Sequence, residues 1–69
     1  MDIRVNGKSE SIPSGSTVNS VLAGKDLDPA LVSVEYNGMI LEKSDLDRTV
    51  LSDGDELEIL FFMGGGERS

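Results

Sequence analysis

Three turn signals divide the chain into short segments and so limit how it can fold. They are Asn6-Gly7, Asn37-Gly38 and Asp53-Gly54-Asp55. Asn-Gly is a preferred pair for a two-residue hairpin because both positions tolerate a positive φ. Asp-Gly pairs favour turns for a similar reason. We therefore expect strands that end at each of these points.

The segments beside the turns alternate between apolar and polar residues, which is the pattern of a half-buried strand. The expected strands are residues 1–5, 8–12, 32–36, 39–41 and 57–61. The second is weakly apolar, so we place it at an edge of the sheet, and we place the third near the centre. In the last strand Leu57, Ile59 and Phe61 share one face, and we expect all three to pack into the core.

One helix is expected between the second and third strands. Ser16 or Thr17 is suited to cap its first turn, and Val18, Val21 and Leu22 follow at the spacing of one helix face. Gly24 is the expected C-terminal stop. The order β-β-α-β-β-β predicts an α+β protein with the ubiquitin-like β-grasp fold, in which one helix packs on one face of a mixed sheet.

Composition excludes several classes of function. The 69 residues include no Cys and no His. A thiolate nucleophile, a Cys/His zinc site and a Ser-His-Asp triad are therefore excluded. The net charge of −7 disfavours binding to nucleic acid or an anionic membrane and favours a basic protein partner. The first ten residues hold no continuous apolar run, so we expect no signal peptide and a cytoplasmic location.

Several fragments together resemble one family. "VNGKSESIPSGSTVNSVL", "VEYNGMILEKSDLDRTVLSDGDELEIL" and the terminal "GGG" fall in the order and spacing of the ThiS family, the sulfur carriers of thiamine biosynthesis. The resemblance covers essentially the whole chain. MoaD-like carriers, the small subunits of molybdopterin synthase, share the fold and the tail, but this chain is shorter. Glu42 and Lys43 depart from the residues that are common in thiamine carriers.

The resemblance implies a carrier rather than an enzyme. In such proteins an E1-like adenylating enzyme uses MgATP to activate the terminal glycine carboxylate, and a sulfur donor converts it to a thiocarboxylate. The sulfur then passes to thiazole synthase or to another sulfur-accepting enzyme, as in cysteine or homocysteine formation. By family spacing, Gly65 and Gly66 are the sulfur-carrying terminus here.

The tail offers a physical reason for its glycines. Without a Cβ, the backbone can pass close to the catalytic groups of a partner. Extended, Met63 to Gly66 reaches about 13 Å. We expect a β-grasp domain over residues 1–62 and a flexible Gly-rich tail over residues 63–69, with Met63 and Gly64 leading to the reacting pair. The chain itself is expected to bind no metal or cofactor and to be a monomer when free.

Three residues follow Gly66, and they conflict with this chemistry. Within the chain the Gly66 carbonyl belongs to an amide, which cannot accept AMP from ATP. Some related carriers have a short extension that a JAMM-type metalloprotease removes. Glu67, Arg68 and Ser69 are therefore either such a processed extension or a remnant with no role in the cell.

Leu60, Phe62 and Met63 are expected on the sheet face opposite Leu57 and Ile59. An apolar patch beside the tail suits docking to a partner, with Leu60 and Phe62 as its main contacts. The alternative is that Leu60 and Phe62 complete a second, minor core.

Acidic residues also recur at Asp26/Asp28, Asp45/Asp47 and Asp53/Asp55/Glu56. Their spacing does not fit an EF-hand calcium loop, so we interpret them as turn formers and solvated charges. For the whole chain, the alternative to a carrier is a ubiquitin-like interaction module with no sulfur chemistry.

Overall fold

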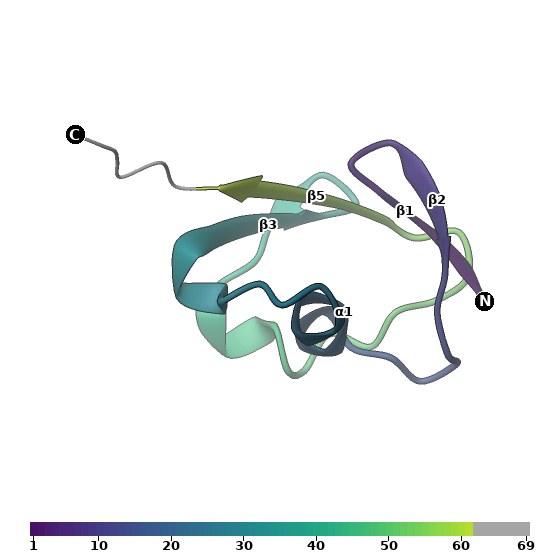
Figure 1. The fold of residues 1–69 in the computed structure, drawn as a ribbon, viewed down its shortest axis with the longest axis horizontal. Helices are drawn as coiled ribbons and strands as arrows, with labels where there is room; N and C mark the ends of the chain where they lie inside the picture. The colour runs from purple at the N-terminus through teal and green to yellow at the C-terminus, as the bar shows by residue number, and fades with distance from the viewer. Residues whose placement is uncertain (62–69) are drawn as a thin grey trace.

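Five strands and one α-helix lie in residues 1–61, the part of the chain that the computed structural model describes (Figure 1). In chain order they are β1 (Asp2–Val5), β2 (Lys8–Ser11), α1 (Val18–Gly24), β3 (Val32–Tyr36), β4 (Met39–Ile40) and β5 (Glu56–Phe61). Two short 3-10 helices, η1 (Pro29–Leu31) and η2 (Lys43–Asp45), lie in the connections. The element order agrees with the order expected from the sequence.

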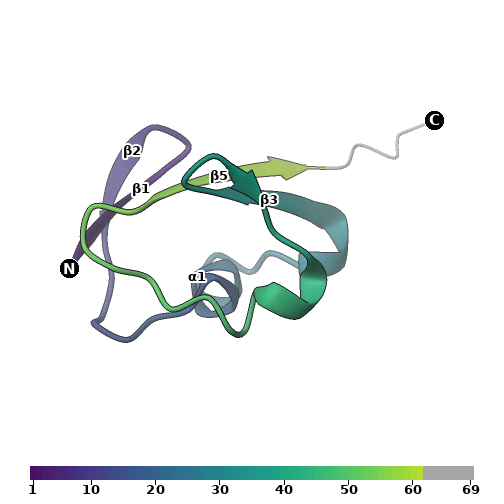
Figure 2. The same cartoon turned by 180° about the vertical axis from the view of Figure 1, so that it is seen from behind.

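The strands form one mixed sheet in the order β2-β1-β5-β3-β4. β5 lies at its centre, parallel to β1 and antiparallel to β3. β2 is an edge strand and β3 an inner one, as predicted. Figures 1 and 2, which view the molecule from opposite sides, both show α1 against one face of the sheet. This is the ubiquitin-like β-grasp arrangement that the sequence predicts.

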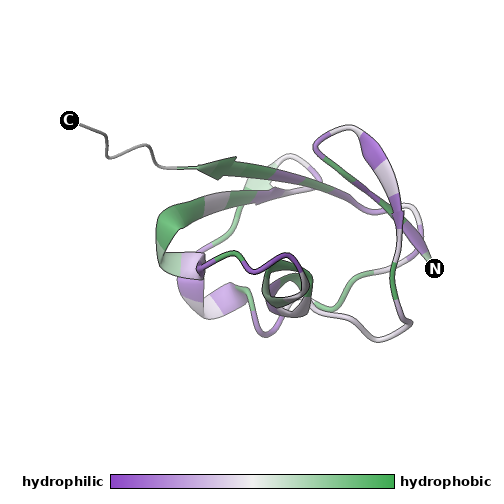
Figure 3. Cartoon of the chain, viewed as in Figure 1, coloured by the Kyte–Doolittle hydropathy of each residue, from purple (hydrophilic) through white to green (hydrophobic). Residues whose placement is uncertain are grey.

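The core lies between α1 and the inner face of the sheet. Figure 3 shows hydrophobic residues on α1, the start of β3 and β5, whereas β2 is mostly polar. Ile3, Leu22 and Leu57 are at most 2% exposed. The buried cluster consists of Ile3, Val5, Val18, Val21, Leu22, Val32, Val34, Leu46, Leu51, Leu57 and Ile59. The strand residues of this cluster are alternate residues of β1, β3 and β5, so the residues between them face the other side of the sheet.

Both ends of α1 are fixed by local hydrogen bonds. Thr17 is the N-cap: its Oγ1 accepts from the backbone N–H of Ser20 at 3.1 Å, and its own N–H donates to Ser20 Oγ at 2.9 Å. This reciprocal pair is a capping box, with Ser in the place usually taken by Glu or Gln. Of the two expected caps, Ser16 and Thr17, the structure therefore selects Thr17.

The C-terminal end of α1 falls at Gly24, as the sequence predicts. Gly24 is the last helical residue, but the left-handed conformation falls on Asp26, with φ 58°. Asp26 N–H donates to Ala23 O at 3.1 Å, and Leu27 N–H donates to Leu22 O at 2.9 Å. These two bonds are those of a Schellman motif, with Asp26 where glycine is usual. The glycine therefore does not supply the positive φ that ends the helix.

Phe61 differs from the prediction. Its pairing with Val32 places it on the inner face of the sheet, as the alternation requires. However, Phe61 is 52% exposed and does not belong to the core. β5 extends two residues beyond Ile59, the last buried residue of the strand, so Phe61 lies at the margin of the core.

No helix in residues 1–61 is long and apolar enough to cross a membrane.

Candidate functional site

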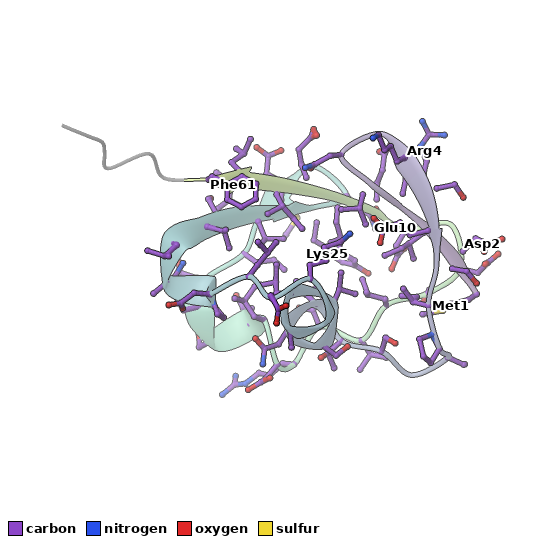
Figure 4. All side chains as sticks on the ribbon, viewed as in Figure 1. Met1, Asp2, Arg4, Glu10, Lys25 and Phe61 are labelled. Carbon is purple, nitrogen blue, oxygen red and sulfur yellow. The ribbon has the colours of Figure 1, made fainter. Side chains whose placement is uncertain are left out.

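The end of β5 is the candidate site, because it leads into the predicted sulfur-carrying tail. Figure 4 labels Phe61 at this end, where the chain leaves the sheet. The predicted residues Phe62, Met63, Gly64, Gly65 and Gly66 lie outside the described part of the chain, as do Glu67, Arg68 and Ser69. The structure therefore describes the root of the tail and, of the predicted site residues, Leu60 alone.

Leu60 lies on the outer face of the sheet and is 50% exposed. Its partner across the β3–β5 ladder is Ser33, a small residue that leaves the leucine side chain open. The next pair on the same face is Glu35 and Glu58. An apolar side chain is thus exposed beside acidic groups at the root of the tail.

A groove lies on the inner side of the sheet, below Phe61. Its residues come from the β1–β2 hairpin, the end of α1 and the end of β5. The apolar ones are Val5, Leu27, Ile59 and Phe61, and the polar and charged ones are Asn6, Lys8, Glu10 and Lys25. Lys25 Nζ and Glu10 Oε2 form an ion pair at 2.5 Å, which joins α1 to the edge strand β2. Figure 4 labels both residues.

Asn6 connects the first hairpin to the end of β5. Its Oδ1 accepts a hydrogen bond from Ile59 N–H at 2.7 Å, and its Nδ2 donates to Ile59 O at 3.3 Å. Asn6 itself has φ 51°, and Gly7 has φ 83°. These are the positive values that a type I′ hairpin turn requires. The turn thus aims the Asn6 carboxamide at the backbone of β5.

Asn37 makes a corresponding contact at the start of β5. Its Oδ1 accepts from Glu56 N–H at 2.8 Å, and its Nδ2 donates to Asp55 Oδ1 at 3.2 Å. Its φ is 48°, so it too occupies the left-handed position of an Asn-Gly turn. The two hairpins therefore hold the central strand at opposite ends and from opposite sides.

The sequence predicts both Asn-Gly turns but does not reveal that their side chains bind β5. The sequence feature that could have indicated these contacts is that both turns contain Asn rather than Asp. A carboxamide offers a donor and an acceptor together, whereas a carboxylate offers acceptors only. Which strand the carboxamide contacts depends on the sheet order, which local sequence does not give.

A polar cluster centred on Asp55 lies at the start of β5. Asp55 accepts hydrogen bonds from the Tyr36 hydroxyl at 3.0 Å, from Asn37 and from Ser52 N–H at 2.8 Å. Desolvation acts to raise the pKa of Asp55, but the three hydrogen bonds outweigh it and the pKa is lowered. The hydrogen bond to Asp55, with smaller effects of desolvation and the carboxylate charge, raises the pKa of Tyr36.

The other predicted acidic clusters act as turn formers. Asp28 accepts locally from Ala30 N–H at 2.9 Å, and Asp45 from Glu42 N–H at 3.2 Å. Asp53 instead accepts from Asp2 N–H at 2.8 Å, which joins the turn before β5 to the start of β1. Within residues 1–61, no three acidic side chains come together in a way that could hold a metal ion. The local bonds of Asp28 and Asp45 support the interpretation of these acids as turn formers.

Glu42 and Lys43, the two departures from the common ThiS pattern, lie in the connection after β4. Glu42 is the N-cap of η2, and the Lys43 ammonium donates to Val32 O at 2.8 Å, at the start of β3. Both residues are thus accommodated by the fold.

Known proteins resemble this chain over nearly its whole length. The model of the ThiS family matches residues 3–66. The crystal structure of a thiamine biosynthesis protein (ThiS) from Geobacter metallireducens superimposes with a TM-score of 0.82 at 38% identity, covering 96% of this chain and 100% of that one. An NMR structure of a thiamine biosynthesis protein from the same organism gives a TM-score of 0.76 at 38% identity, covering 96% and 88%.

Two curated relatives are thiazole synthases. That of Paramagnetospirillum magneticum is 36% identical over 66 residues, which are 96% of this chain and 20% of that protein. That of Magnetococcus marinus is 31% identical over 67 residues, which are 97% of this chain and 21% of that protein. The chain thus spans about a fifth of the length of these relatives. The family match and the shared fold together show that this chain belongs to the ThiS family.

Proposed function

We propose that this chain is a sulfur carrier of thiamine biosynthesis whose sulfur is held as a thiocarboxylate on Gly66. The observation that carries the proposal is where the family match ends: it runs to residue 66 and excludes the last three residues. Residue 66 is the second glycine of the pair Gly65-Gly66. The chain acts as a substrate of its partners, which supply the metal, acid and base.

The chemistry begins at the free carboxylate of Gly66. A carboxylate oxygen attacks the α-phosphorus of ATP, and pyrophosphate leaves with the electron pair of the broken P–O bond. A sulfide-level sulfur donor then attacks the acyl carbon of the adenylate, and AMP leaves. The product is a terminal thiocarboxylate. No side chain of the carrier takes part, which suits a sequence that contains neither Cys nor His.

The place where β5 ends supports this role. β5 is the central strand, and Figure 4 labels Phe61 at its end. From Phe61 to Gly66 an extended chain reaches about 17 Å. This length would let the terminus enter a partner while the folded body stays outside.

Two partners follow from this chemistry. An E1-like adenylating enzyme that uses MgATP would activate the carboxylate. The sulfur-accepting partner would be thiazole synthase, because the two relatives with that name contain a segment similar to nearly this whole chain.

Leu60, exposed on the outer face of the sheet, would form the docking patch together with Phe62. Burial of such side chains against a partner is a common source of binding energy.

Removal of Glu67, Arg68 and Ser69 would precede activation. As long as Ser69 is attached through them, the Gly66 carbonyl is an amide and offers no carboxylate to ATP. A JAMM-type metalloprotease is the proposed processing enzyme. The division into a β-grasp domain over residues 1–62 and a tail over residues 63–69 belongs to the same proposal.

The test compares two chains, one ending at Gly66 and one ending at Ser69. Each is incubated with an adenylating enzyme of the ThiS pathway, MgATP and sulfide, and its intact mass is measured. We expect only the shorter chain to gain the mass difference between sulfur and oxygen. A Gly66-ending chain that binds the enzyme but never gains this mass would contradict the carrier function and favour an interaction module.

A further inference from the structure

We propose that the outer face of the sheet docks an arginine-bearing surface of the adenylating enzyme, and that Glu35 and Glu58 together bind the arginine. The inference rests on the proposed function, because it names the chemistry of the partner that covers the docking patch around Leu60. The contacts that carry it lie within residues 1–61.

Glu35 of β3 and Glu58 of β5 lie directly opposite each other on the outer face of the sheet. Side chains at such positions have Cβ atoms about 5 Å apart, and two like charges there destabilise a sheet. Glu35 is partly buried and Glu58 is exposed. Neither carboxylate forms a hydrogen bond or an ion pair with any group of residues 1–61. The free protein therefore keeps two uncompensated like charges side by side, at a cost to its stability.

The preceding acid on the same face of β5 has a cation beside it. Glu56 Oε2 lies 3.6 Å from Nε of Arg4, its partner in the β1–β5 ladder. That ladder ends one residue later, where Val5 pairs with the residue before Glu58. Beyond it the first hairpin turn contributes Gly7, which has no side chain. A cation that pairs with Glu58 would therefore come from a second molecule.

A hollow of about 280 Å³ lies at this point of the sheet. Its lining includes Gly7 and Gly38 from the two Asn-Gly turns, together with the glutamates Glu35, Glu56 and Glu58. An added Cβ at either glycine would meet no atom within 4 Å, so the space beside both turns is open. A long side chain from outside can therefore reach the two opposed carboxylates.

Exposed apolar side chains flank the two glutamates. Ile40 lies opposite Glu35 in the β3–β4 ladder and is 70% exposed. Leu60 follows Glu58 on the same face of β5 and is 50% exposed. A partner that covered both apolar residues would exclude water from the charges between them, and exclusion of water strengthens an ion pair. Apolar surface and uncompensated charge thus occur together on the docking face.

A guanidinium suits this arrangement better than an ammonium or a metal ion. Its five N–H donors lie in a planar fork and can bond two carboxylates at once, whereas an ammonium acts as a point charge. Within residues 1–61, no three acidic side chains come together in a way that could hold a metal ion. The structure thus favours an arginine side chain as the group that binds between Glu35 and Glu58.

The adenylating enzyme is the partner whose chemistry matches this face. An enzyme that binds MgATP stabilises the negative triphosphate with positive groups, so the entrance to its nucleotide site is positively charged. The net charge of −7 on this chain favours encounter with such a surface. The two glutamates would then fix the position of the carrier once the surfaces meet.

Glu58→Gln separates docking from folding, because the two should change in opposite directions. The substitution removes one of the two like charges and keeps the shape of the side chain. In the free full chain we expect Tm to rise by about 2 °C. The Kd for the adenylating enzyme should rise about tenfold, because the arginine loses one of its two carboxylates. Calorimetric titration of the full chain, and of the chain ending at Gly66, measures this affinity.

Two further variants complete the comparison. Glu35→Gln should act like Glu58→Gln, since it removes the other charge of the pair. Asp47→Asn is the matched control: it also removes one exposed negative charge, but Asp47 is bonded to Asn19 of α1, which packs on the opposite face of the sheet. Its affinity should stay within about twofold of the wild type.

Unchanged affinity in Glu58→Gln and Glu35→Gln, an equal loss in Asp47→Asn, or no binding by the wild type would overturn the inference. A fall in Tm in both glutamine variants would also overturn it, because the pair would then serve the fold. A wild-type chain that binds as expected but never gains sulfur at Gly66 would defeat the proposed function and leave the docking face standing. Sulfur gained with the same KM by the wild type and both glutamine variants would overturn this inference alone.

Discussion

The Tyr36 hydroxyl donates a 3.0 Å hydrogen bond to Oδ2 of Asp55, which joins the end of β3 to the turn before β5. Hydrogen bonds from Ser52 N–H, Asn37 and Tyr36, in that order, outweigh desolvation and lower the pKa of Asp55. The bond to Asp55 is the main cause of the raised pKa of Tyr36, because it favours the neutral phenol. The hydrogen bonds around Asp55 therefore give the fold two opposite dependences on pH.

Stability should fall at both ends of the pH range. For Asp55, whose pKa is lowered by folding, the contribution is present above its ordinary pKa near 4 and is lost as pH falls through the lower folded-state value. For Tyr36, whose pKa is raised, the contribution is present below about pH 10 and is lost as pH rises through the higher folded-state value. Urea unfolding across pH should show both losses.

Tyr36→Phe tests the source of this dependence. We expect it to lower the free energy of unfolding at pH 7 by about 1 kcal/mol, since one hydrogen bond to a partly exposed carboxylate is lost. The variant should also reduce the fall in stability at acidic pH and remove the part of the alkaline fall that comes from Tyr36. An alkaline profile identical to that of the wild type would contradict the assignment.

The two Asn-Gly turns should contribute similarly to stability. Asn6→Gly and Asn37→Gly each remove two side-chain hydrogen bonds while keeping the positive φ, so each should cost about 1–2 kcal/mol in urea unfolding. Their costs should be nearly additive, because they contact different ends of β5. A loss below about 0.3 kcal/mol in either variant would show that water replaces its carboxamide fully.

Gly24→Ala should stabilise the protein. Gly24 is helical, its φ is not positive, and an added Cβ would meet no atom within 4 Å. Alanine should therefore gain about 0.5–1 kcal/mol from helix propensity. Gly38→Ala is the control: its φ of 88° is strained for alanine, so it should destabilise. A loss of stability in Gly24→Ala would contradict this expectation and show that the end of α1 requires glycine at position 24.

The structure shows which features of the fold can be predicted from local sequence and which cannot. Alternation and turn pairs act over a few residues, so they correctly predict the strands. The element order predicts the mixed sheet, and the Ser16-Thr17 pair predicts the helix cap. Gly24 correctly marks the end of the helix, but the sequence does not reveal that Asp26 supplies the positive φ after it. The prediction that Phe61 packs into the core is wrong. Alternation indicates which face of the sheet a residue occupies, but not where the elements packed over that face end.

The candidate site was predictable only in part. Leu60 lies where alternation places it, and its role in docking stays a prediction. The contact of Asn6 with Ile59 joins residues 53 positions apart in sequence. It depends on β5 lying beside β1, and only the sheet order reveals this.

The docking patch gives a prediction about binding. Leu60→Asp should weaken binding of the adenylating enzyme about tenfold or more while the circular dichroism spectrum stays unchanged. Val50→Asp is the control, because Val50 is similarly exposed, at 57%, but lies in the segment that bridges to Thr17. Equal losses of affinity in both variants would indicate a general effect of charge, and unfolding of Leu60→Asp would assign Leu60 to the core instead.

The most direct test of the carrier function is the intact mass of the protein recovered from its native cell while the sulfur pathway is active. We predict a chain of residues 1–66 in which one oxygen of the Gly66 carboxylate is replaced by sulfur. Recovery of only the chain ending at Ser69, with no sulfur added, would contradict both the processing and the carrier function.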